Sequence, residues 1–75
     1  MSEPGRDVAV RGGAIRLGQF LKLAGLVDAG GDAKAVLAEG AVTVNGDPEL
    51  RRGRQLASGD VVQVGKERIR VIAAE

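Results

Sequence analysis

The chain has 75 residues, with 11 Lys or Arg against 10 Asp or Glu and a formal net charge of +1. It contains no cysteine and no histidine, which excludes disulfides and the usual ligands of a structural zinc. No apolar run approaches the roughly 20 residues of a membrane span, and the N-terminus lacks the apolar region of a signal peptide, so we expect a cytoplasmic protein without a membrane partner.

The first predicted elements follow a disordered tip at residues 1–7. Residues 8–75 are expected to form a single domain, because a chain of 75 residues is long enough for one domain at most. The core of so small a domain supplies only about 3–5 kcal/mol of stability. A short strand over residues 8–10 precedes a helix that begins at Ala14 and stops at Gly25. The apolar residues of this helix recur at helical spacing and share one face: Leu17, Phe20, Leu21 and Ala24.

A second helix is predicted over residues 33–39, ending at Gly40. The turn before it offers Asp28 and Asp32 as candidates to cap its first free amides. Gly18 lies inside the first helix, where glycine costs about 1 kcal/mol relative to alanine, which indicates close packing or the close approach of a ligand. Two short helices, each with one apolar face, must pack on another surface.

The second half of the chain predicts β-structure. Asn45-Gly46 between alternating apolar residues is typical of a hairpin with a type I′ turn, because that turn needs positive φ at both central positions. We expect strands at residues 42–44, from Leu50 onward, at 61–64 and at 68–72, with turns at 58–60 and 65–67. The fold class is therefore α+β, with two short helices packed on a small, mainly antiparallel sheet.

The expected core combines apolar residues of the helices and strands: Leu17, Phe20, Leu21, Val36, Leu37, Val44, Val62 and Ile69. In the last strand, Ile69 and Val71 face inward while Arg68 and Arg70 face outward, because side chains alternate with a period of two.

Three arginines, Arg51, Arg52 and Arg54, follow the hairpin and lie between two predicted strands. Guanidinium groups presented by a fixed scaffold favour a phosphate-rich partner. The alternative is that these arginines form a solvated charged loop. Because the net charge is close to zero, any electrostatic site must be a local patch.

The residues needed for most catalysis are missing from this chain. Without histidine, cysteine or tyrosine it lacks most general bases and covalent nucleophiles, so we expect no enzyme, no cofactor and no metal. Phe20 is the single aromatic residue, which excludes RNA-binding modules that stack bases on several exposed aromatics.

Four segments, taken in order and spacing, resemble the S4 RNA-binding domain: residues 16–22, 31–37, 40–46 and 58–62. The resemblance covers about residues 14–64. Since no catalytic domain accompanies these segments, the chain is most similar to small stand-alone bacterial S4-like proteins of the YbcJ type. The resemblance implies an αL-type motif, in which two helices and an adjoining β-hairpin form a basic RNA-binding face.

The basic residues of this implied face are Arg16, Lys22, Lys34, Arg51, Arg52 and Arg54. Arg16 matches the arginine that usually opens the first helix, and Lys34 matches the basic residue of the second. Gln19 and Gly30 stand where many S4 domains have lysine and arginine.

The leading hypothesis is a monomeric, non-enzymatic module that contacts structured RNA, such as ribosomal or transfer RNA, with the ribosome as a further candidate partner. One alternative is a protein–protein adaptor on an S4 fold. Another is an accessory domain that acts with a separate RNA-modifying enzyme.

Overall fold

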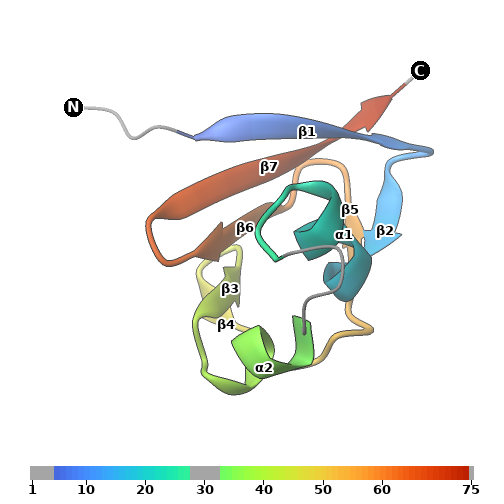
Figure 1. Ribbon diagram of the computed structural model, residues 1–75. Helices are drawn as coiled ribbons and strands as arrows, with labels where there is room; N and C mark the ends of the chain where they lie inside the picture. The colour runs from blue at the N-terminus through green and yellow to red at the C-terminus, as the bar shows by residue number, and fades with distance from the viewer. Residues whose placement is uncertain (1–4, 28–32, 75) are drawn as a thin grey trace.

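The computed structural model describes residues 5–27 and 33–74. Its strands are β1 (Arg6–Arg11), β2 (Ala14–Arg16), β3 (Val42–Val44), β4 (Asp47–Pro48), β5 (Gln55–Ala57), β6 (Val61–Val64) and β7 (Glu67–Ala74). Its helices are α1 (Leu17–Leu23) and α2 (Ala33–Ala38). Figure 1 shows the path of the chain through these elements.

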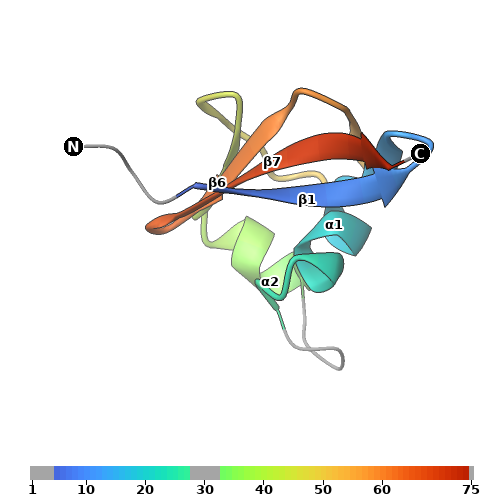
Figure 2. The same cartoon turned by 90° about the horizontal axis from the view of Figure 1, so that it is seen from above.

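The main sheet has the strand order β1-β7-β6-β3-β4, and β2 pairs with β5 in a separate two-stranded sheet. The β1–β7 pair is parallel, whereas the other pairs are antiparallel. Both helices lie on the same side of the main sheet (Figure 2). The expected α+β class with two helices on a mainly antiparallel sheet is confirmed, and the parallel edge strand makes that sheet mixed.

The N-terminal strand is longer than the sequence predicted. β1 begins at Arg6, so residues 6 and 7 belong to the sheet and not to a tip, because the whole of β1 pairs with β7 (Figure 1). Asp7 and Arg70 are partners in this register and form an ion pair of 3.2 Å. Arg6 donates a 2.6 Å hydrogen bond to the carbonyl of Ala24, which ties β1 to the end of α1.

The start of the first helix also differs from the prediction. Ala14–Arg16 form β2, because they pair with β5, and the helix begins only at Leu17. Arg16 has extended backbone angles, with φ −80° and ψ 149°. The predicted end at Gly25 is confirmed: Gly25 has φ +76°, and its amide and that of Leu26 donate to helix carbonyls in the pattern of a Schellman motif.

The type I′ hairpin is confirmed at Asn45-Gly46, whose φ angles are 54° and 87°. The strand predicted from Leu50 onward begins later, at Gln55, because β4 ends at Pro48 and residues 49–54 form a loop before β5. The last strand is longer than expected at both ends: it begins at residue 67, which pairs with β6, and it ends at residue 74, since its final residues pair with β1. Gly40 follows α2 with φ +75°, as predicted, while Asp28 and Asp32 lie outside the described residues.

The core lies between the helices and the main sheet. Seven of the predicted core residues are buried, and Val36 is half-buried and packs against them. Five further residues belong to this cluster: Val10, Ala24, Val42, Leu56 and Val71. Of these, the sequence had placed Ala24 on the apolar face of the first helix and Val71 on the inner face of the last strand. Within the described residues, no helix is long and apolar enough to cross a membrane.

Candidate nucleic-acid interface

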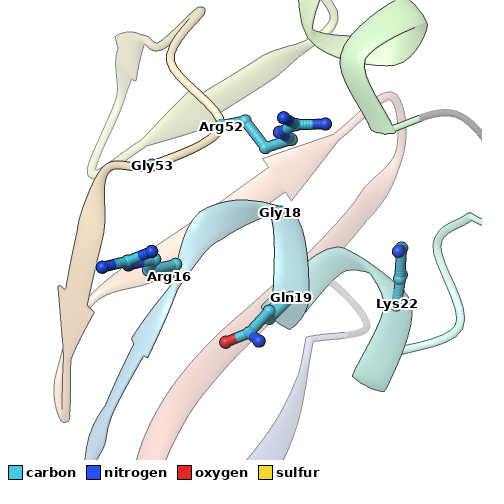
Figure 3. Close-up of a pocket in the computed structure, with 6 residues that line it drawn as sticks. All are labelled: Arg16, Gly18, Gln19, Lys22, Arg52 and Gly53. Carbon is cyan, nitrogen blue, oxygen red and sulfur yellow. The ribbon is translucent and has the colours of Figure 1, made fainter.

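An open hollow of about 360 Å³ lies at the first turns of α1, beside the loop of residues 49–54. It is lined by Arg16, Gly18, Gln19, Lys22, Arg52 and Gly53. Figure 3 shows the cationic side chains around it, from the end of β2, from α1 and from the loop. Two segments that are separate in the sequence, residues 16–22 and the loop of residues 49–54, therefore bring positive charge to one place.

Backbone hydrogen bonds hold the loop against the helix. The amide of Leu17 donates to the carbonyl of Arg54 at 2.8 Å, and the amide of Gly18 donates to the carbonyl of Arg52 at 2.9 Å. No side chain caps this helix at Arg16, so the loop carbonyls satisfy amides that the helix itself leaves unpaired. Two of the amides at this end of the helix are therefore bonded to the loop, and the side chains supply the positive charge of the hollow.

Gly18 is the residue that lets the loop approach this closely. A Cβ at this position would clash with Cγ of Arg52 and would lie 3.1 Å from its Cδ and 3.5 Å from its carbonyl oxygen. The glycine predicted to permit close packing therefore does so against the arginine loop. This contact brings the Arg52 side chain over the hollow.

Glu49 holds the other two arginines of the loop. The residue is only 7% exposed and is the one buried charged residue among those described. Arg54 donates from Nη1 to Oε1 at 2.9 Å, and Arg51 donates from Nε to Oε2 at 3.1 Å. The backbone amide of Arg51 also donates to Oε2, at 3.0 Å. Both carboxylate oxygens are thus occupied by donors of the same loop.

The pKa of Glu49 reflects these bonds. It falls from 4.5 to about 2, first because of the hydrogen bond from Arg54 and then because of the backbone and side-chain donors of Arg51. Burial raises the pKa, but by less than the donors lower it. Glu49 is therefore a carboxylate over the whole physiological pH range.

The six basic residues predicted for the site separate into groups. Arg16, Lys22 and Arg52 line the hollow and are exposed. In the parts of the chain that the structure describes, none of these three forms an ion pair, whereas Arg51 and Arg54 both pair with Glu49. The remaining residue, the lysine at position 34, lies in α2, and its side chain is outside the described part.

Two residues of the site were not predicted from the sequence. Gln19 was noted only as a departure from the S4 pattern, but it lines the hollow. Glu49 was not considered, although an acidic residue just before an arginine cluster is a signal for ion pairing. Across residues 5–27 and 33–74, no group of three or more acidic residues is placed to hold a metal ion.

The fold and this basic hollow define a small α+β domain of the S4 type. An S4 domain family model matches residues 8–72, which is most of the chain, so the chain belongs to the S4 domain family. It is also similar to the "Probable ribosome maturation protein RlbA" of Bacillus subtilis (strain 168). The two are 56% identical over 50 residues, which cover 67% of this chain and 70% of that protein.

Proposed function

We propose that this chain is a non-enzymatic RNA-binding module that contacts structured RNA through the basic hollow at α1. Ribosomal RNA is the target that we place first, since the Bacillus relative is named as a ribosome maturation protein. Transfer RNA is the second structured target. In this proposal the chain acts as a monomer in the cytoplasm, and α1, α2 and the β3–β4 hairpin correspond to an αL-type face.

The observation that carries the proposal is the convergence of Arg16, Lys22 and Arg52 on one hollow. Cationic side chains that lack a carboxylate partner are free to bind phosphate oxygens, and arginine does so with two donors at once. Gln19 adds an amide that can both donate and accept, so it can bond to a ribose hydroxyl or a base edge.

The mode of recognition follows from what the hollow contains. Phe20 is fully buried and is the single aromatic residue of the chain, so no ring is available for base stacking. Arginine and lysine contacts to phosphate position a protein on RNA and sense the shape of its backbone. We therefore expect preference for folded RNA over plain single strands, with little discrimination among base sequences.

The direct test is a titration of ribosomal RNA fragments at several salt concentrations. A triple variant, Arg16→Gln, Lys22→Gln and Arg52→Gln, removes the three cations of the hollow. Log affinity falls linearly with log salt, and the steepness of this fall, the salt slope, decreases by about 0.7 to 0.9 for each lost phosphate contact. The triple change should therefore lower the salt slope by roughly 2 to 3. A folded triple variant with the parent's slope would refute this site.

A matched control removes the same charge from elsewhere on the molecule. Arg11, Lys66 and Arg68 are exposed and lie outside the hollow, so changing them to glutamine should leave most of the slope intact. If the folded parent binds no RNA, the adaptor hypothesis replaces this one. If the parent does bind RNA, crosslinking in cells followed by sequencing of the bound RNA distinguishes ribosomal from transfer RNA.

A further inference from the structure

We infer that Glu49 is a specificity-determining residue, which withholds Arg51 and Arg54 from RNA so that Arg52 is the one RNA-contacting arginine of its loop. This inference rests on the proposed RNA-binding function. It assigns different tasks to three arginines that are equivalent in the sequence pattern.

The hydrogen bonds of Glu49 direct both arginines toward the carboxylate. Arg54 has its guanidinium on Oε1 and a side chain only 33% exposed. Arg51 is held twice, by its Nε and by its backbone amide, both on Oε2, although its side chain is 77% exposed. For each arginine, part of the fork of donors that would grip a phosphate is already in use.

Arg52 lies between these two residues and behaves differently. Its carbonyl is bonded to the amide of Gly18, and its side chain extends over the hollow beside that glycine (Figure 3). It forms none of the ion pairs found among the described residues. The loop therefore presents one uncommitted guanidinium, at the place where Arg16 and Lys22 also contribute charge.

A phosphate does not readily displace Glu49. Taking Arg51 or Arg54 away would remove one of the two guanidinium partners of a carboxylate that is only 7% exposed, and a buried charge that loses its partners is strongly unfavourable. The carboxylate also offsets one of the three positive charges of the loop. Since non-specific RNA affinity grows with the number of phosphates neutralised, Glu49 limits binding to arbitrary RNA and leaves the hollow to recognise shape.

Two neighbouring single variants test the inference while Glu49 and its hydrogen bond from Arg54 stay in place. Arg51→Gln and Arg52→Gln each remove one charge from an exposed side chain. With a ribosomal RNA fragment, Arg52→Gln should lower the salt slope by about 0.7 to 0.9, whereas Arg51→Gln should leave it within error of the parent. Equal losses in the two variants would overturn the inference. An unchanged slope in both variants would overturn it too, because Arg52 would then not contact RNA. If the folded parent does not bind RNA, the proposed function itself fails.

Releasing the two arginines gives the complementary test. Glu49→Gln should bind an unstructured polyuridine RNA more tightly than the parent, with a slope steeper by about 0.7 to 0.9 for each arginine that gains a phosphate. The ratio of affinities for folded and unstructured RNA should fall.

Glu67→Gln, which removes the same charge from an exposed side chain, is the control. The same effect in both variants would overturn the inference, because the loss of any negative charge would then raise RNA affinity, whether or not it lies beside Arg51 and Arg54. Should Glu49→Gln melt before binding can be measured, the comparison of Arg51 and Arg52 decides alone.

Discussion

The side chain of Arg52 packs on the α carbon of Gly18 at the first turn of α1. The amide of Gly18 donates to the carbonyl of Arg52 at 2.9 Å, and a Cβ on Gly18 would clash with the Arg52 side chain. A backbone hydrogen bond thus joins one residue of the helix to one of the loop, and the helix residue must be glycine for the Arg52 side chain to fit beside it. The geometry of the basic hollow depends on this contact.

Gly18→Ala should therefore weaken RNA binding through Arg52 while the domain remains folded. The added Cβ must push the Arg52 side chain aside, but alanine gains about 1 kcal/mol of helix propensity, which offsets part of the steric cost. We expect the salt slope to fall by about 0.7 to 0.9, as for Arg52→Gln. Gly5→Ala is a suitable control, because Gly5 lies outside the hollow and a Cβ there would make only ordinary contacts with Arg68, the nearest atom at 3.6 Å. An unchanged slope for folded Gly18→Ala would contradict the importance of this contact.

Phe20→Ala should unfold a large part of the population at room temperature. Phe20 is fully buried in the core between the helices and the sheet, and truncating a buried phenylalanine costs about 3–5 kcal/mol. A domain of this size has a core stability of similar magnitude. Urea denaturation followed by circular dichroism measures the loss. A cooperative transition near that of the parent would argue against this packing.

Gly46→Ala should destabilise the β3–β4 hairpin. Gly46 has φ +87°, a left-handed conformation that costs an alanine about 1–2 kcal/mol. Asn45 occupies the other left-handed position of the turn and bonds through its side chain to Asp60 and to the amide of Val61. The urea midpoint should fall by a corresponding amount. Stability equal to that of the parent would show that the turn relaxes at no cost.

The stability of the parent should fall at acid pH because Glu49 becomes protonated. Its pKa is about 2 in the folded chain against 4.5 as the ordinary value, so between these values the unfolded chain binds a proton that the folded chain does not. The contribution of Glu49 is therefore complete above about pH 4.5 and is lost as the pH falls toward 2. Urea midpoints of the parent and Glu49→Gln should converge over this range. Two parallel curves would contradict the role of the carboxylate.

Short-range patterns predicted much of this molecule correctly. The apolar face of α1, the end of that helix at Gly25 and the type I′ turn at Asn45-Gly46 all agree with the structure. The alternation in β7 was also correct, with Ile69 buried and Arg70 exposed. These features depend on residues within a few positions of one another, where the periods of helix and strand and the need for positive φ act directly.

Contacts between distant segments decided the rest. Residues 14–16 form a strand because β5 lies beside them, and Arg6 joins the sheet because β7 offers it a partner. The three arginines of the loop are alike in sequence, but the buried carboxylate of Glu49 binds two of them. The side chain of the third, Arg52, packs against Gly18 of α1. The sequence by itself determined which residues carry positive charge. Only the tertiary structure decided which of these charges are free, because ion pairing and burial depend on where side chains meet in space.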